Sequence, residues 1–186
     1  MSEYQSILTE VDGYVGILTL NKPQRHNAFD EQLIAEMTAG LRELAADPRV
    51  RAVVLSSTGK SFCAGADLQW MKRAAGYSDQ ENLQDARRLA ELMATLNELA
   101  KPTIARVQGP AHGGGVGLIA ACDIAVGTYD ALFALSEVKL GIVPAVISPY
   151  VLAAIGERYC RRYMLTAERF SAAEAYRIGL LHELVP

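Results

Sequence analysis

The residues best suited to chemistry in this chain lie in two glycine-rich turns. The first turn is Phe62-Cys63-Ala64-Gly65-Ala66-Asp67, and the second is His112-Gly113-Gly114-Gly115-Val116-Gly117. Each turn follows an apolar run typical of a buried strand, and each precedes a segment expected to be helical. The first N–H groups of a helix have no partner within it, and the helix dipole makes that end positive. Two such ends brought together can hold a negatively charged oxygen between two N–H donors, which is the chemistry of an oxyanion hole.

Each turn also has a plainer structural interpretation. Gly65 permits a tight bend between a strand and a helix, and three successive glycines permit close packing of a helix on a sheet. A nucleotide-binding loop is not indicated, because the second turn lacks the Gly-x-Gly-x-x-Gly spacing and no Gly-Lys-Ser/Thr sequence follows it.

Strand-like and helix-like segments alternate along the chain, and these elements must position the two turns. Asp30 and the capping box at Ser78–Glu81 predict the starts of two amphipathic helices, the second with apolar residues at helical spacing over Leu89–Leu99. Asp12-Gly13 predicts a hairpin turn. We therefore predict an α/β fold in a single domain over residues 1–186. Strands are expected over 4–10, 14–20, 52–55, 103–107, 123–127, 131–135 and 180–185, and further helices over 150–155, 158–165 and 172–178.

The composition argues against several function classes. The chain has 186 residues, a formal net charge of −3 and 51% hydrophobic residues, which is an ordinary balance for one globular domain. This balance indicates no nucleic-acid or membrane-surface partner. Cys63, Cys122 and Cys160 match neither a disulfide framework nor a zinc-binding spacing, so no metal is expected. With no visible secretory signal and no apolar run of about 20 residues, we expect a cytoplasmic, reducing compartment.

Together, the two turns and their surroundings resemble the enoyl-CoA hydratase/isomerase family, also called the crotonase family. The resemblance covers nearly the whole chain, and its most specific parts are Phe62–Asp67, Gly113–Gly115, Cys122–Ile124 and Glu137–Gly141. It implies a crotonase spiral of stacked ββα units, which forms two roughly perpendicular sheets flanked by helices. It also implies a C-terminal helical segment that builds a homotrimer or hexamer, and we expect this chain to end before that segment.

The resemblance implies an acyl-CoA thioester as substrate and no separate cofactor, because coenzyme A is itself part of that substrate. The N–H groups of Ala66 and Gly114 match the two donors to the thioester carbonyl oxygen, which becomes an enolate oxygen during the reaction. Donors at that oxygen act mainly in the transition state. The residues that match positions along the path of coenzyme A and its pantetheine arm are Arg25, Ala28, Ala64, Asp67 and Leu68. Arg25 is expected either to face a phosphate or to be an ordinary solvated arginine.

The catalytic carboxylates are the first place where the chain departs from the family pattern. Hydratases of the family hold one water between two glutamates, and the second of these matches Glu137. The first has no match, because its position is occupied by Gly117. A lone glutamate can act as a general acid or base and can move a proton between two carbons, as in the family's isomerases. Hydration, double-bond isomerisation and a non-catalytic acyl-CoA-binding subunit therefore all stay open.

A second departure follows Pro144. The stretch Ala145–Tyr150 replaces the glycines and the Gln-Arg pair of familiar hydratases, and it resembles branched-chain hydratases acting on methylglutaconyl-CoA or isoprenoid glutaconyl-CoA substrates. Val146 and Ile147 are expected to narrow or reshape the acyl pocket. The leading prediction is therefore hydration of a branched or medium-length 2-enoyl-CoA, with Glu137 handling the proton at the α-carbon or on water.

Other residues near the turns have less specific interpretations. His112 could relay a proton, but a structural role is favoured because a poised histidine needs a partner. Trp70 and Met71 fit either the acyl pocket or helix packing. Cys63 has no basic partner apparent in the sequence, so we expect a small buried hydrophobic residue there. Asp67 is expected to cap a short helix.

Overall fold

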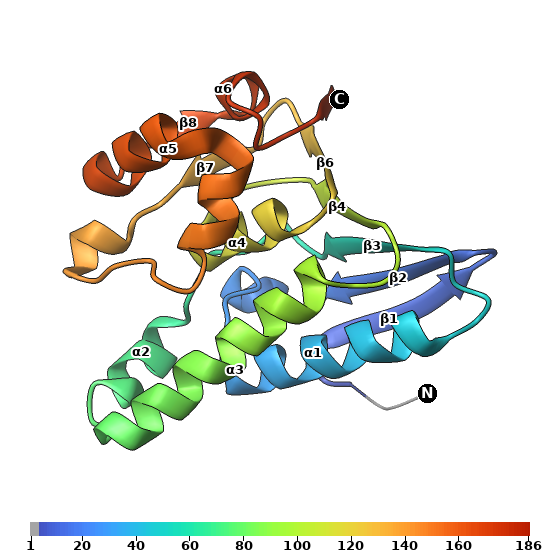
Figure 1. Ribbon diagram of the computed structural model, residues 1–186, viewed down its shortest axis with the longest axis horizontal. Helices are drawn as coiled ribbons and strands as arrows, with labels where there is room; N and C mark the ends of the chain where they lie inside the picture. Colours follow the sequence, from blue (N-terminus) through green and yellow to red (C-terminus); the bar gives the residue numbers. More distant parts are fainter. Residues whose placement is uncertain (1–3) are drawn as a thin grey trace.

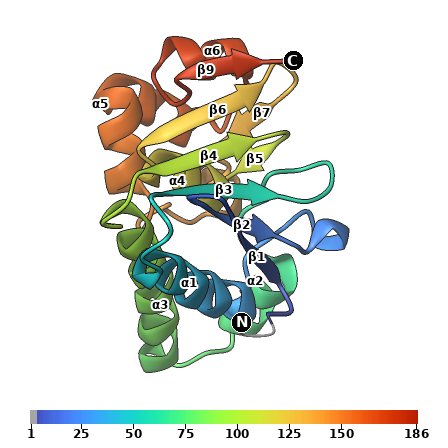
Figure 2. The same cartoon turned by 90° about the vertical axis from the view of Figure 1, so that its right-hand side faces the viewer.

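The computed structural model describes residues 4–186, and its largest element is the six-stranded sheet seen in Figure 2. Across this sheet the strands are β1 (Ile7–Asp12), β2 (Val15–Leu20), β3 (Ala52–Ser57), β4 (Thr103–Val107), β6 (Ile124–Thr128) and β9 (Glu183–Val185). β1 and β2 form an antiparallel hairpin, and each later neighbouring pair is parallel. Parallel neighbours need crossover connections, which in this chain contain the helices.

A second, three-stranded sheet lies next to the glycine-rich turns. Its order is β5 (Ala111–His112), β7 (Leu132–Ala134) and β8 (Phe170–Ser171), with β5 parallel and β8 antiparallel to β7. Single backbone bridges join Cys63 to Ala111 and Phe29 to Ala66. The first turn is therefore tied on one side to the strand that leads into the second turn.

Helices flank the sheets and form the other layer of the molecule. They are η1 (Pro23–Arg25), α1 (Glu31–Ala46), α2 (Leu68–Ala74), α3 (Asp79–Asn97), α4 (Gly114–Ala121), η2 (Glu137–Leu140), α5 (Ser148–Thr166) and α6 (Ala172–Arg177), where η marks a short 3-10 helix. α1 and α3 lie side by side, and α4 packs against α5 (Figure 1). Within residues 4–186, no helix combines the length and apolar character needed to cross a bilayer.

The predicted helix starts are confirmed at atomic detail. The Asp30 side chain accepts a hydrogen bond from Leu33 N, and Ser78 and Glu81 form a reciprocal capping box. Each cap satisfies backbone N–H groups that have no partner within the helix. Beyond these caps, apolar residues at helical spacing turn one face of α1 into the core, namely Leu33, Ile34, Met37, Leu41 and Leu44.

Two local predictions need correction, and a predicted division between two helices is confirmed. Asp12 pairs with Val15, so the hairpin turn is Gly13-Tyr14 rather than Asp12-Gly13. Leu99 lies beyond the end of α3 but still packs against the core. The two helices expected over 150–155 and 158–165 are confirmed as the two segments of α5, which a kink separates at Gly156, where the backbone is non-helical with a φ of 75°. Only glycine reaches this backbone conformation without a steric cost.

Candidate functional site

The two glycine-rich turns pack directly against each other, backbone to backbone. A Cβ atom added to Gly65, whose φ is +86°, would lie 2.8 Å from His112 O and 3.6 Å from Gly114 N. A Cβ on Gly115 would lie 2.4 Å from Cys63 O. These glycines are therefore required for close approach, and the approach places the start of α4 beside the first turn.

The N–H groups predicted as oxyanion donors are free of protein acceptors. Phe29 N donates to Gly65 O at 2.7 Å and Asp67 N donates to Phe29 O at 2.8 Å. These bonds use the neighbours of Ala66, so the Ala66 N–H points away from Phe29. Gly114 is the first residue of α4 and has no intrahelical acceptor. Over the described residues 4–186, neither the Ala66 nor the Gly114 N–H has a protein partner, so both can serve a ligand.

All of the predicted site residues line one cavity of about 850 Å³. These residues are Arg25, Ala28, Ala64, Ala66, Asp67, Leu68, Gly114 and Glu137. They come from the loop around η1, the two turns, the start of α2 and the start of η2. The structure therefore brings together every residue that the resemblance selected, and the volume lies in the range of small-molecule and cofactor sites.

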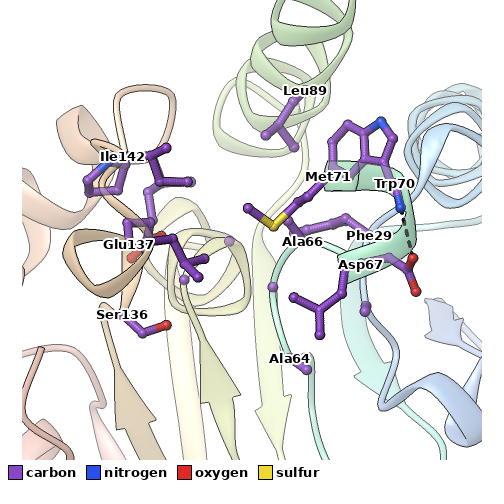
Figure 3. Close-up of a pocket in the computed structure, with 18 of the residues that line it drawn as sticks. Phe29, Ala64, Ala66, Asp67, Trp70, Met71, Leu89, Ser136, Glu137 and Ile142 are labelled. Atoms are coloured by element: carbon purple, nitrogen blue, oxygen red, sulfur yellow. Dashed lines mark hydrogen bonds between the residues drawn. The ribbon is translucent and has the colours of Figure 1, made fainter. Parts of the chain in front are cut away.

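Glu137 faces this cavity across from the first turn, as Figure 3 shows for Glu137 and Ala66. Its carboxylate packs against the second turn, because a Cβ on Gly113 would lie 2.8 Å from Oε1. Gly113 thus leaves the space that the carboxylate occupies. Burial raises the pKa of the Glu137 carboxyl above its usual value. Within the described residues Oε2 is buried without a hydrogen-bond partner, which is rare in folded proteins and indicates a role with a ligand.

The space beside Gly117, where the first glutamate of the family pair has no match, is filled by an apolar side chain. A Cβ on Gly117 would lie 2.3 Å from Ile147 Cγ2 and 2.7 Å from Ile147 Cβ, with Met93 Cε at 3.5 Å. Ile147 is only 3% exposed and directly precedes α5. A glutamate at position 117 therefore has no room while Ile147 stays in place. The wall next to α4 is apolar where familiar hydratases have a carboxylate.

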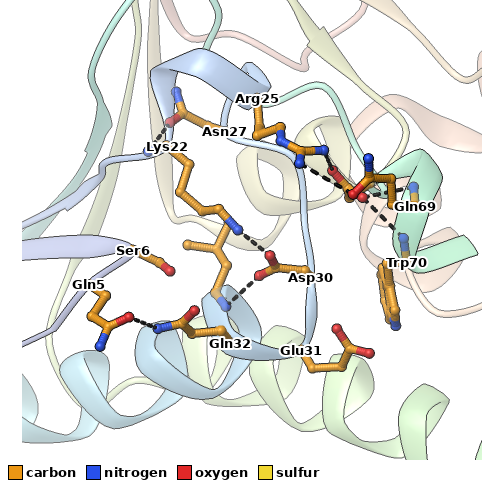
Figure 4. A network of polar contacts seen from close by, with 12 residues as sticks. Gln5, Ser6, Lys22, Arg25, Asn27, Asp30, Glu31, Gln32, Gln69 and Trp70 are labelled. Carbon is orange, nitrogen blue, oxygen red and sulfur yellow. Dashed lines mark hydrogen bonds and ion pairs between the residues drawn. The ribbon is translucent and has the colours of Figure 1, made fainter. Parts of the chain in front are cut away.

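Among the residues that line the cavity, Arg25 contacts Asp67 Oδ2 and Gln69 Oε1, each at 3.3 Å (Figure 4). Asp67 caps α2 by accepting from Gln69 N and Trp70 N, as predicted. Although partial burial opposes it, these N–H groups and Arg25 lower the pKa of Asp67. The Arg25 side chain is 51% exposed, so its guanidinium remains accessible to a charged ligand.

Asn27 builds the loop that carries Arg25 and Ala28, a role the sequence did not reveal. Its side chain is fully buried, accepts from Lys22 N at 2.8 Å, and donates to Thr58 O and Ser61 O at 2.8 and 3.0 Å. Its φ of 54° is a conformation that asparagine tolerates better than most residues. Asn27 therefore positions a wall of the cavity without lining it.

The structure separates the alternatives left open for the other residues near the turns. Cys63 is fully buried, and burial raises the pKa of its thiol to about 12, which confirms a buried hydrophobic residue. His112 and Arg169 line a second cavity of about 310 Å³, and His112 is not among the residues that line the cavity containing Glu137. Burial and the Arg169 charge lower the pKa of His112. Trp70 and Met71 do line the main cavity.

Phe29 and Ser136 also line the main cavity, and neither was predicted from the sequence to do so. A Cβ on Gly114 would lie 2.5 Å from Phe29 Cε2, so this ring packs against the donor residue itself. The run of glycines indicated that another part of the chain packs closely against Gly114, but no nearby residue identified Phe29 as that part. Among residues 4–186, no group of three or more histidine, cysteine, aspartate or glutamate side chains is arranged to hold a metal ion.

Comparison with known proteins agrees with this geometry. A family model described as enoyl-CoA hydratase/isomerase matches residues 10–186. The chain is 49% identical to a crotonase-family protein of Legionella pneumophila, with a TM-score of 0.96 over 99% of this chain and 71% of that one. It is 45% identical to an enoyl-CoA hydratase of Shewanella pealeana, with a TM-score of 0.97 over 98% of this chain and 69% of that one.

A curated relative gives the same result. An enoyl-CoA hydratase of Alternaria alternata is 37% identical over 174 residues, which are 91% of this chain and 55% of that protein. The α/β crotonase fold predicted from the sequence is confirmed, and the names of the relatives support an enzyme of the hydratase (lyase) class. The free N–H pair, the facing glutamate and the match over residues 10–186 together place this chain in the enoyl-CoA hydratase/isomerase family.

Proposed function

We propose that this protein adds water across the double bond of a 2-enoyl-CoA thioester, with Glu137 as its single acid–base residue. The observation that supports this most directly is the unpartnered, buried Oε2 atom of Glu137, which belongs to a side chain lining the same cavity as the free N–H groups of Ala66 and Gly114. A base on one side of a substrate and an oxyanion site on the other is the arrangement that conjugate addition to a thioester needs.

In the proposed reaction, the N–H groups of Ala66 and Gly114 bind the thioester oxygen. Glu137 accepts a proton from water while the water oxygen forms a bond to the β-carbon. The electron pair of the double bond moves towards the carbonyl, and the resulting enolate oxygen is held by the two donors. Glu137 then delivers its proton to the α-carbon, which returns the carboxylate to its starting state. Interactions that strengthen as the enolate forms accelerate the reaction rather than merely bind substrate.

Coenzyme A would occupy the part of the cavity lined by Arg25, Ala28, Ala64, Asp67 and Leu68. The half-exposed guanidinium of Arg25 supports contact with a phosphate group, since arginine pairs readily with phosphate oxygens. Coenzyme A is part of the substrate in this proposal, and the reaction needs no further cofactor.

The acyl end supports a branched substrate. Val146 and Ile147 both line the cavity, and Ile147 also fills the space beside Gly117. These β-branched side chains have few rotamers, so they form a rigid wall that selects the shape of an acyl group. We therefore propose a methylglutaconyl-CoA-like or other branched 2-enoyl-CoA over a straight long-chain one.

Isomerisation is the second candidate, and the apolar wall at Gly117 and Ile147 favours it. A site with one carboxylate can move a proton between the α- and γ-carbons without holding a water. Product analysis by mass spectrometry in ¹⁸O-labelled water separates the candidates. A 3-hydroxyacyl-CoA with the label supports hydration, and a shifted alkene without it supports isomerisation. Binding with no product from any acyl-CoA tested would favour a non-catalytic subunit instead.

The activity should depend on pH through Glu137. The proposed base must be ionised, and burial raises its pKa, so kcat/KM should fall on the acid side at a higher pH than an ordinary glutamate would give. A pH–rate profile of the wild-type enzyme measures this limb. If kcat/KM instead fell at the pH at which a solvent-exposed glutamate is protonated, the role of a buried base would be contradicted.

Gly117→Glu should destabilise the fold by about 1–3 kcal/mol or more, because the new side chain meets Ile147 and buries a carboxyl group. Adding Ile147→Ala should recover part of the loss, so the two changes should be non-additive. Gly76→Glu is the matched control, since a Cβ there meets only Arg73 O at an ordinary 3.5 Å. Thermal unfolding measures these three variants and Ile147→Ala alone, and equal effects at positions 117 and 76 would contradict the packing argument.

A further inference from the structure

The far wall of the main cavity contains the only tryptophan of the chain. Trp70 is 8% exposed, and it is the one residue of α2 that is buried. It lines the cavity together with Met71 of α2 and with Ala86 and Leu89 of α3. Figure 3 shows Trp70, Met71 and Leu89 on the side away from Glu137. An acyl group whose thioester lies at Ala66 would extend along this apolar surface.

A buried carboxylate on α3 holds the Trp70 ring. Asp85 is 7% exposed, and its Oδ2 accepts a hydrogen bond from Trp70 Nε1 at 2.8 Å. The other carboxylate oxygen forms a long ion pair with Arg88, whose Nη1 lies 3.9 Å away. A buried carboxylate held by one neutral donor and one long ion pair to an exposed arginine gains little to offset its desolvation. The burial of Asp85 is therefore better explained by its hydrogen bond to the Trp70 ring than by a gain in stability.

The contacts of Trp70 connect this wall to the oxyanion site. Its backbone N donates to Asp67 Oδ1 at 3.0 Å, and Asp67 directly follows Ala66. Its ring is held by Asp85 on α3, at the opposite end of the residue. α2 has seven residues and is too short to keep its own orientation, so these two bonds fix where the indole stands. Trp70 thereby sets the distance between the Ala66 N–H and the apolar wall of the cavity.

We infer that Asp85 is a positioning residue for Trp70, and that the pair sets the size and branching of the acyl group that the cavity accepts. This inference rests on the proposed function only in taking an acyl-CoA as the ligand. An ionised or amide oxygen at position 85 keeps the indole in place, whereas an apolar side chain releases it. A released indole changes the depth of the cavity, and with it the preferred acyl group.

The single tryptophan makes the inference measurable by fluorescence without turnover. We would titrate the protein with saturated acyl-CoAs, namely acetyl-, butyryl-, isovaleryl- and octanoyl-CoA, with free coenzyme A as the blank. Indole emission responds to the polarity around the ring, so acyl groups that reach the wall should shift it and free coenzyme A should not. This readout stays valid whether the enzyme hydrates, isomerises or only binds its ligand.

Four variants complete the test. Asp85→Asn keeps an oxygen acceptor and should retain the wild-type emission and acyl preference. Asp85→Leu removes the acceptor and should shift both, changing the ratio of affinities between two acyl groups by about tenfold or more, the effect of a methylene group in an apolar pocket. Trp70→Phe, which lacks the donor, should shift the preference measured by calorimetry even if Asp85→Leu fails to fold. Glu91→Gln is the control, since this exposed α3 carboxylate pairs with Arg42.

The outcomes separate this inference from the proposed reaction. Wild-type acyl preference in both Asp85→Leu and Trp70→Phe would overturn the positioning role, even in an enzyme that hydrates normally. An acyl-dependent emission shift that Asp85→Leu abolishes and Asp85→Asn retains would support it, even if no hydration were found. An equal loss in Asp85→Asn and Asp85→Leu would also overturn it, because the hydrogen-bond acceptor would then not be the relevant feature.

Discussion

Glu137→Gln should lower kcat for hydration by about 10²–10⁴-fold, the contribution of a positioned general acid–base group. The amide has nearly the same shape as the carboxyl but cannot accept the proton from water. Because the substitution is nearly isosteric, the cavity and its N–H donors should stay intact, and the affinity for a saturated acyl-CoA should change little. The measurement is steady-state kinetics with a 2-enoyl-CoA, alongside calorimetric binding of its saturated analogue.

Glu157→Gln is the matched control for this prediction. Glu157 lies on α5 with its side chain 74% exposed, paired with Arg161 at the surface. Its loss should leave the rate unchanged, since an exposed ion pair contributes little. If Glu137→Gln kept the full rate, the single-base mechanism would be wrong, and another group lining the cavity would have to move the proton. If the rate fell but saturated acyl-CoA also failed to bind, the effect would be structural.

Gly114→Ala should lower kcat/KM by about 10²–10³-fold, the loss expected for one oxyanion donor. The new methyl group would lie 2.5 Å from Phe29 Cε2, so the packing must shift there, and a shift of the start of α4 away from the buried ring displaces its N–H. A displacement of about 1 Å is enough to cost about 100-fold in rate. Kinetics with the preferred enoyl-CoA, and thermal unfolding of the same sample, separate a misplaced donor from a misfolded protein.

Phe29→Leu provides the second arm of this test. Leucine lacks the ring atom that the new methyl group meets, so the double variant Gly114→Ala with Phe29→Leu should regain part of the rate. Phe29→Leu alone should cost little rate, because its backbone still pairs with Gly65 and Asp67. A folded Gly114→Ala variant with wild-type activity would exclude the Gly114 N–H as a donor.

Much of the fold was predictable from local signals. Asp30 and the Ser78–Glu81 capping box satisfy orphan N–H groups of their own helices, so their effect is written within a few neighbouring residues. The hairpin turn was misplaced by one residue, because its register is decided by the pairing of Asp12 with Val15 across the strands. The division of α5 at Gly156 was predicted correctly, because a glycine that interrupts a helical pattern is itself a local signal.

The candidate site was predictable in its membership and not in its packing. Every residue selected through the family resemblance lines one cavity, and the roles of these residues stay predictions until they are tested. The sequence predicts a departure from the family pattern at Gly117, and only the structure shows that Ile147 occupies the space beside it. The two residues are far apart in the chain, so no local pattern connects them.

The sequence by itself determined the two glycine-rich turns, because a close backbone approach demands glycine at particular positions, whatever lies opposite. It also determined that Glu137 matches one member of the family's pair of glutamates and that the other member has no match. The tertiary structure alone decided that the turns meet, that Ile147 excludes a second acid, and that Asp85 holds Trp70. These are contacts between distant segments, and they depend on side-chain volumes and burial that exist only once the core has packed.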